Sequence, residues 1–295
     1  MKLVNQGHSI YRYDFNLDPI TNIYNQIEFA GRTCYKSTRP EGKTAEDFVR
    51  MLIKSKHYAM LEHGTVYLYK ETRGRLFDLF DRYGTNKYSY CNPKLINGTC
   101  IEYVTTNLRV IKENGWEDDL KYICQPTLFH KERVMIRFIC SRAIAQELTR
   151  HRVFSFAMES QRYCNYSKDK FSNEVKYVIP SFFIHNLGGE GYTNHLEVIS
   201  KTPKDNYSKE EFSFINSCIQ NEKDYFNLLE TLPPEHARSV LNNSCKTELV
   251  MTGFVEDWKH LFELRSSKAT TGKPHPDMVN LIDNLIHSNF YNEIF

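Results

Sequence analysis

Long apolar runs are absent from this 295-residue sequence, and no stretch approaches the length needed to cross a bilayer. The N-terminal segment also lacks a continuous apolar core followed by a cleavage site. Both absences predict a cytoplasmic protein that does not engage membranes. A charge of one sign is lacking as well, since 38 Lys and Arg oppose 36 Asp and Glu. A net charge of +2 is too small for the protein as a whole to attract nucleic acid electrostatically, so any anion must bind at a local cluster of positive charge.

The cysteine pattern excludes two further kinds of site. Eight cysteines are scattered without CxxC spacing, which argues against a zinc ribbon and against a dithiol redox pair. We therefore expect no metal site. In the cytosol the thiols should stay reduced and act mostly as small buried hydrophobic groups.

Internal repeats, low-complexity tracts and interdomain linkers are also missing. With 41% hydrophobic and 14% aromatic residues, the chain can form a substantial core. Helical and strand periodicities occur together along it. We predict a single elaborated domain over residues 1–295, of the α+β class. It should have a mixed or antiparallel sheet flanked by long helices, and an irregular insertion around residues 72–130.

Capping residues predict the first two helices. Asp18 and Pro19 are typical of a helix start, and Gly31 is expected to end that helix before a polar turn over residues 32–37. Thr44 should cap a second helix that ends near residue 57.

The later elements follow from the same signals. The Asn97-Gly98 pair predicts a tight hairpin turn, and Ser208 with Glu211 forms a capping box that should open a long helix. Pro233 and Pro234 should end that helix. We further expect strands over 65–69 and 134–140, and helices over 106–114, 141–150, 235–241, 254–265 and from 276 onward.

The most informative stretch is 150–163, where charged and neutral donors alternate closely. Arg150, Arg152 and Arg162 offer forked guanidinium groups suited to phosphate, while Ser, Gln and Tyr can orient a heteroaromatic ring. Between residues 131 and 162, seven Lys and Arg oppose three acids, a surplus of four that exceeds the whole-chain charge. The stretch therefore predicts a nucleotide pocket.

Other interpretations of this cluster stay open. Arg and His often lie at helix C-termini as solvated partners of the helix dipole, and an ion-pair network could absorb the charges. Successive helical residues fan about 100° apart, however, so three adjacent cations cannot share one solvated face. A nucleic-acid-binding module or a non-catalytic oligomeric scaffold could also use these residues. The near-neutral total charge counts against the first, and the focused charge against the second.

The Arg150-His151-Arg152 triplet, followed by seven residues and Ser160, resembles the signature of the flavin-dependent thymidylate synthases. The match continues through Arg162-Tyr163 and spans most of the chain in order. Its other segments are Gly31 through Cys34, His57 through Glu62-His63, Glu235 through Ser239, and Trp258 through Arg265.

The resemblance implies an FAD-dependent thymidylate synthase that makes dTMP from dUMP. Methylene-tetrahydrofolate would supply the carbon, and NADPH would supply reducing equivalents through FAD. None of the eight cysteines follows a proline, which is consistent with a route that uses no cysteine nucleophile. The split pockets of this family further imply a homotetramer whose active sites are shared between chains.

The resemblance also assigns site residues. Arg265 matches the arginine that polarises the uracil ring and is the catalytic candidate. For Ser160 we favour binding over nucleophilic attack, because no base is assured nearby. The residues assigned to FAD are His57, Ala59, Glu62, Arg150, His151, Arg152, Met158 and His260. Those assigned to dUMP are Glu147, Arg150, Met158, Glu159, Ser160, Gln161, Arg162, Arg238, on its phosphate side, and Arg265.

Several positions depart from the family pattern. Ala157 and Met158 stand where many members have Asn and Glu or Gln. Ala59 replaces a common hydroxyl residue, and Phe254 and Glu256 stand where some members have flavin-contacting Asn and Arg. These contacts must be remade or lost.

Overall fold

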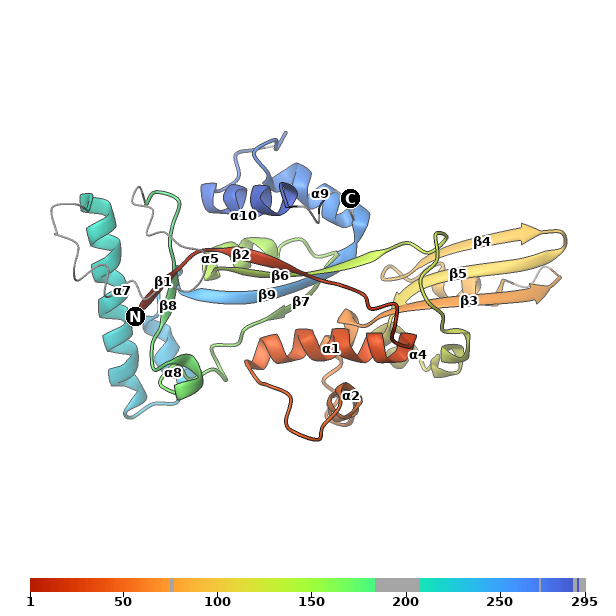
Figure 1. Ribbon diagram of the computed structural model, residues 1–295, viewed down its shortest axis with the longest axis horizontal. Helices are drawn as coiled ribbons and strands as arrows, with labels where there is room; N and C mark the ends of the chain where they lie inside the picture. The colour runs from red at the N-terminus through yellow and green to blue at the C-terminus, as the bar shows by residue number, and fades with distance from the viewer. Residues whose placement is uncertain (75–76, 184–206, 271, 289–290, 292–295) are drawn as a thin grey trace.

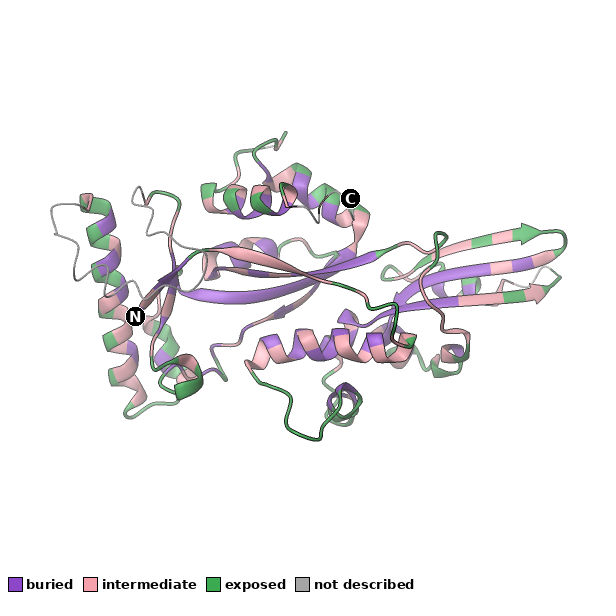
Figure 2. Cartoon of the chain, in the orientation of Figure 1, coloured by how far each residue is buried: buried purple, intermediate pink, exposed green. Residues whose placement is uncertain are grey.

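A four-stranded antiparallel sheet in the order β2-β6-β9-β7 lies at the centre of the protein (Figure 1). The computed structural model describes residues 1–295 except 75–76, 184–206, 271, 289–290 and 292–295. The strands are β2 (Gly7–Tyr11), β6 (Arg133–Ser141), β7 (Ser155–Met158) and β9 (Lys246–Phe254). Because β6 and β9 are the inner strands, most of their residues are buried (Figure 2). The strand predicted over 134–140 is confirmed.

Side-chain alternation along β6 and β9 divides the core into two layers. Met135 and Val250 pack with α1 (Pro19–Tyr35) and α2 (Ala45–Lys54) on one face. Ile136 and Met251 pack on the other face with α5 (Arg142–Leu148), α9 (Val255–Arg265) and α10 (Pro276–Ile286). The sheet is thus covered by helices on both sides.

Helix α1 continues past Gly31, which corrects the expectation that this glycine ends it. The helix runs to Tyr35, and Lys36 forms its cap with a left-handed φ of 49°. A Cβ on residue 31 would lie 2.7 Å from ring carbons of Phe48. Gly31 therefore permits close packing of α1 on α2, and the predicted polar turn begins only after the helix. The predicted cap of α2 is confirmed, since Thr44 and Asp47 form a capping box.

Residues 72–130 are more regular than the sequence indicated. The strands β3 (Thr65–Arg73), β5 (Thr99–Asn107) and β4 (Tyr90–Ile96) form an antiparallel sheet that extends as an arm from the centre (Figure 1). The predicted hairpin turn is confirmed, because Asn97 and Gly98 both adopt positive φ. Around the arm lie α3 (Asp78–Tyr83), α4 (Leu108–Asn114) and η2 (Glu117–Tyr122). Helix α4 starts later than predicted, because β5 includes residues 106 and 107.

A third core cluster lies at the opposite end of the molecule. The parallel pair β1 (Lys2–Val4) and β8 (Lys176–Val178) packs there with α7 (Lys209–Leu229), which begins at the predicted capping box of Ser208 and Glu211. The helix predicted over 235–241 is divided into α8 (Pro234–Ala237) and η5 (Arg238–Val240). The short turns η1 (Tyr58–His63) and η3 (Asp169–Phe171) complete the described elements. The predicted α+β class with antiparallel sheets is confirmed. Among the described residues, no helix combines the length and apolarity that a membrane crossing demands.

Candidate functional site

The motif of residues 150–152 follows directly on the end of α5. Ser141 caps this short helix by accepting a hydrogen bond from the Ile144 N–H at 3.3 Å. The His151 N–H donates to the Leu148 carbonyl at 3.1 Å, which turns the chain toward β7. The triplet therefore lies at the negative end of the helix dipole, as the sequence predicted.

Helix α9 brings Arg265 to the same place. It is anchored by Trp258, whose indole N–H donates to the Val134 carbonyl at 3.1 Å and whose side chain is fully buried. At the end of α9, Arg265 Nε donates to His151 Nε2 at 3.1 Å, and Arg265 Nη1 lies 3.8 Å from Glu147 Oε2. Three predicted site residues from two distant segments thus meet in one cluster.

His151 is neutral in this cluster. Burial, followed by the charges of Arg265 and His260, lowers the pKa of His151 to about 4. Because Nε2 accepts the hydrogen bond from Arg265, any ring proton resides on Nδ1. The cluster therefore presents one guanidinium charge beside a neutral imidazole, while His260 lies exposed one helical turn earlier.

Arg150 and Arg152 extend from this cluster into solvent. Both are exposed, and within the described part of the chain neither side chain makes a hydrogen bond or ion pair. Two unpaired guanidinium groups beside His151 are a donor set suited to a phosphate or pyrophosphate. The chemistry of these residues fits a dinucleotide such as FAD.

The segment after β7 alternates between inward and outward side chains. Glu159 is buried, where its carboxylate accepts hydrogen bonds from Lys246 Nζ at 2.7 Å and from the Tyr166 hydroxyl at 3.1 Å. Gln161 is also buried and donates to Cys245 Sγ at 3.2 Å. In this chain both predicted dUMP residues are therefore engaged internally.

The outward residues of the segment are more accessible. Met158 and Ser160 are half-buried, and the Ser160 N–H donates to the Cys34 carbonyl at 3.0 Å, which ties the segment to the end of α1. Arg162 is exposed and pairs through Nε with Glu235 at 2.9 Å. Arg238 Nε donates to the carbonyl of the same Glu235 at 3.2 Å. Two arginines predicted to bind dUMP thus meet at Glu235.

An aromatic bridge connects this second group to His57. The Tyr35 hydroxyl lies 3.0 Å from His57 Nδ1, and the Tyr35 ring lies 5.6 Å from that of Tyr163, centroid to centroid. The Arg162 guanidinium lies 5.4 Å from the Tyr163 centroid. Sequence reasoning missed Tyr35, although its position directly after the matching segment Gly31 through Cys34 was a usable signal.

Glu62 is held by residues that the sequence did not suggest. Its carboxylate pairs with Arg109 of α4, and its carbonyl accepts from Arg133 at 3.2 Å. The neighbouring Ala59 is exposed. The arm thus supports this part of the candidate site through Arg109, a contribution hidden by the sequence separation of residues 62 and 109.

A buried ion network behind the segment was also missed. Lys246 Nζ bridges Glu159 and Glu248, the latter at 3.0 Å, and Lys36 pairs with Glu248. Lys246 and Lys36 together lower the pKa of Glu248 to about 2, against the opposing effect of burial. This network joins α1, β9 and the end of β7, and so fixes the orientation of residues 158–162.

The departures at 254 and 256 have new partners. Phe254 lies beneath the Arg133 guanidinium, 5.7 Å from ring centroid to Cζ, and Glu256 pairs with Lys131 at 3.4 Å. Neither residue offers the amide or guanidinium donor of the family pattern. Within the described residues, no group of three or more His, Cys, Asp or Glu side chains could hold a metal ion.

The site residues thus form two groups at the two ends of β7. One contains Glu147, His151 and Arg265, and the other contains Arg162, Arg238 and His57. No hydrogen bond or ion pair links them within the described residues. Since β7 contributes four extended residues, at about 3.3 Å each, its length separates the two groups by roughly 10 Å.

The family described as "Thymidylate synthase complementing protein" matches residues 125–282, more than half of the chain. A "Probable flavin-dependent thymidylate synthase" of Paramecium bursaria Chlorella virus 1 is 25% identical over 165 residues, covering 56% of this chain and 70% of the relative. A flavin-dependent thymidylate synthase of Corynebacterium aurimucosum is 22% identical over 245 residues, covering 82% of this chain and 67% of the relative.

One solved structure aligns over the whole chain, but with low similarity. The UMP/dUMP methylase PolB from Streptomyces cacaoi, bound with 5-Br UMP, aligns with 100% of this chain and 92% of its own. The TM-score is 0.46 and the identity is 13%.

Proposed function

The chain belongs to the thymidylate synthase complementing protein family, and from this premise we propose that it methylates dUMP to dTMP as a flavin-dependent enzyme. The observation that carries the proposal is the contact of Arg265 with His151, 3.1 Å apart. It joins the predicted catalytic residue to the predicted flavin triplet. No cysteine nucleophile enters the reaction.

Arg265 acts on the uracil ring. Its guanidinium uses Nε for His151, which leaves Nη donors for an oxygen of the ring. Negative charge that develops on uracil when carbon 5 attacks the one-carbon unit is stabilised there. The neutral state of His151 matters because only a neutral imidazole keeps the Nε2 lone pair that accepts the hydrogen bond from Arg265.

Arg150, His151 and Arg152 would hold FAD, with contributions from His57, Ala59, Glu62, Met158 and His260. When bound, this cofactor supplies the redox chemistry that the side chains lack. Arg150 and Arg152 would neutralise its phosphates, and Glu62, which pairs with Arg109, would accept from a ring or ribose donor.

Arg162 and Arg238 would bind the phosphate of dUMP. A phosphate entering between them would displace the Glu235 carboxylate from Arg162 and draw Arg238 away from the Glu235 carbonyl. Glu147, Arg150, Met158, Glu159, Ser160, Gln161 and Arg265 complete the proposed nucleotide site. Because the two groups lie at opposite ends of β7 and share no hydrogen bond or ion pair within the described residues, we propose that a site takes its parts from neighbouring copies in a homotetramer.

Methylene-tetrahydrofolate is the proposed carbon donor and NADPH the proposed reductant. Converting a methylene group to a methyl group requires two electrons. NADPH supplies them, so one NADPH is consumed for each dTMP and the folate leaves as tetrahydrofolate.

An absorption spectrum and a coupled assay test this function. Purified protein reconstituted with FAD should show an oxidised-flavin band, and its NADPH oxidation should respond to dUMP. The proposal would be contradicted if the protein could not be reconstituted with FAD, or if it formed no dTMP with all co-substrates present. The remaining candidate would then be a non-catalytic nucleotide-binding or nucleic-acid-binding protein.

A further inference from the structure

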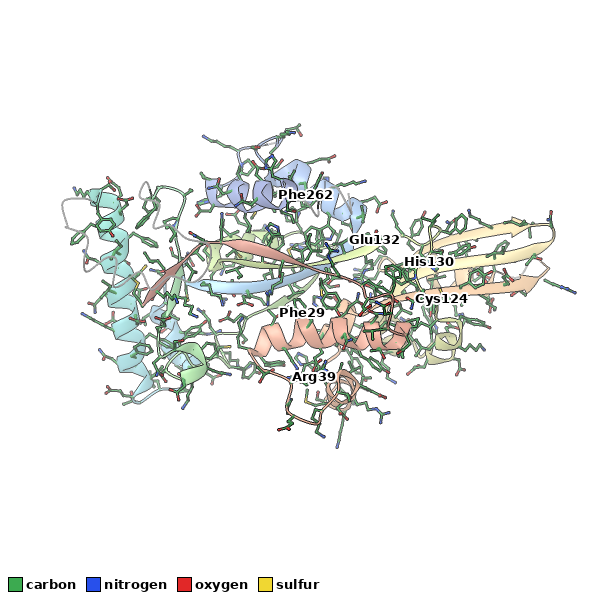
Figure 3. The ribbon with its side chains drawn as sticks, in the orientation of Figure 1. Phe29, Arg39, Cys124, His130, Glu132 and Phe262 are labelled. Carbon is green, nitrogen blue, oxygen red and sulfur yellow. The ribbon has the colours of Figure 1, made fainter. Side chains whose placement is uncertain are left out.

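A cavity of about 810 Å³ lies where the arm joins the central sheet, away from the residues assigned above. Figure 3 labels Cys124, His130 and Glu132 at this junction. The volume falls in the range of about 300–1,000 Å³ that small-molecule sites occupy. It is therefore large enough for an aromatic molecule.

Aromatic side chains form a large part of the wall. Tyr11, Tyr13 and Tyr67 line the cavity, and the rings of Tyr13 and Tyr67 lie 6.3 Å apart in an edge-to-face arrangement. The Tyr13 hydroxyl donates to Gln125 Oε1 at 2.6 Å, which fixes its ring. Such walls favour a flat, polarisable ring as the occupant.

Two side chains of the lining each have one nitrogen donor without an acceptor among the described residues. Gln26 is only 6% exposed, and its Oε1 accepts from the Thr65 N–H at 2.8 Å. Its Nε2 donates to nothing within the described residues. Arg133 is 9% exposed and uses Nη1 and Nη2 on the oxygens of Glu62, Thr65 and Ser155, but its Nε has no acceptor in the same part of the chain.

Arg133 has no directly paired counter-charge within the described residues, although the more distant carboxylates of Glu62 and Asp257 act to raise its pKa. All its hydrogen-bond acceptors are neutral oxygens, and it forms no ion pair with a described carboxylate. Burial lowers the pKa of Arg133 to about 10, so the group is still charged at pH 7. A buried guanidinium without a carboxylate is costly unless an anion completes it. Arg133 and Gln26 both line the cavity and both contact Thr65, so the two side chains lie close together in its wall, as binding to one carboxylate requires.

A catalytic role for the nearby thiol is excluded. Cys124 Sγ lies 3.9 Å from His130 Nε2, but that nitrogen also lies 3.0 Å from the Leu68 carbonyl, and Nδ1 accepts from the Thr127 N–H. The imidazole is thus committed to the backbone. Burial raises the pKa of Cys124 to about 11, so the thiol stays protonated. The thiol therefore offers no thiolate nucleophile to the cavity.

We propose that this cavity binds an aromatic carboxylate, whose ring packs among Tyr11, Tyr13 and Tyr67 and whose carboxylate accepts from Arg133 and Gln26. Glu132, which also lines the cavity, would accept from an amino or hydroxyl substituent on the ring. The remaining face of the ring would meet Pro126 and Leu128 of the loop between η2 and β6.

Calorimetric titration of the full chain with benzoate tests the proposal. Benzoate should bind about tenfold or more tightly than benzamide, because a charged hydrogen bond to a guanidinium is lost in the amide. Cyclohexanecarboxylate should also bind more weakly, because it is not planar. No benzoate binding at millimolar concentration, or equal binding of benzamide, would overturn the proposal.

The matched variant is Gln26→Glu, which keeps an oxygen for the Thr65 N–H and places a carboxylate beside Arg133. Benzoate affinity should fall about tenfold or more. Gln220→Glu, which makes the same charge change on the exposed face of α7, should leave it unchanged. If Gln26→Glu fails to fold, Tyr13→Leu tests the aromatic wall and should weaken binding several-fold. Unchanged binding in either folded variant would contradict the site.

The readout is independent of the proposed enzyme activity. Benzoate binding requires neither flavin nor dUMP, and it should persist in Arg265→Ala. A failure of the thymidylate synthase assay would therefore leave this inference standing, and the converse holds as well.

Discussion

Arg265 is the residue at which one substitution should separate chemistry from folding. Arg265→Ala removes the donor proposed to stabilise charge on uracil, so dTMP formation should fall by about 10²–10³-fold or more. Far-ultraviolet circular dichroism should be unchanged, because the side chain only borders the core. Lys259→Ala, exposed on the same helix, is the control and should keep full activity. A fully active Arg265→Ala would refute the proposed role.

His63 should make the protein sensitive to acid. It is fully buried and lies 2.8 Å from Thr252 Oγ1, and burial, followed by Arg133, lowers its pKa to about 3. An unfolded histidine titrates near about 6.5, so the unfolded chain takes up a proton first as the pH falls. His63 therefore costs no folding stability above about pH 6.5, and the loss of stability grows as the pH falls toward 3.

Urea unfolding at pH 7.5 and pH 5 measures this effect. His63→Asn, which keeps a polar atom near the Nδ1 position, should lose less stability between these values than the parent chain. His151, whose pKa is also lowered, keeps part of the dependence in the variant. His236→Asn on the surface should behave like the parent chain, and an identical slope in all three proteins would contradict the prediction.

At the scale of elements, the packing of α1 on α2 depends on the absence of a side chain at position 31. Gly31→Ala should improve helix propensity by about 1 kcal/mol. The added methyl would meet the Phe48 ring at 2.7 Å, and overpacking of this kind costs about 1–3 kcal/mol or more. We expect a net loss of stability in thermal unfolding. Gly7→Ala, with open space around the added carbon, should change little, and a stabilised Gly31→Ala would show that Phe48 yields freely.

The elements also show which predictions depend on local chemistry. Thr44 and Ser208 were predictable caps, because a cap requires only residues three positions apart. The end of α1 was not predictable, because position 31 requires glycine for close packing against the Phe48 ring and not for a turn. The arm was underestimated for a related reason. Strand β5 pairs with β3 across more than twenty intervening residues, and no local pattern reports such a pairing.

At the scale of the whole molecule, the two groups of site residues predict shared active sites. Arg150 and Ser160 lie on opposite ends of β7, so inactive variants at the two positions should complement each other in mixed oligomers. After equal mixing and subunit exchange, about a quarter of the sites should contain both intact residues. Activity and light scattering measured on the same sample would check this, with each variant alone as control. Mixed oligomers without recovered activity would contradict the shared site.

The sequence by itself determined the chemistry of the site and the positions of most elements. The density of Arg, His, Ser and Gln in residues 150–163 can be read directly from the sequence. Local periodicity likewise identifies β6, α9 and α10 without any knowledge of what these elements pack against. Only the tertiary structure decided which side chains are available. It turned Glu159 and Gln161 inward, brought Tyr35 to His57, and placed Arg109 of the arm on Glu62. These contacts join residues far apart in the chain, and their direction is set by packing and charge compensation, which no local pattern encodes.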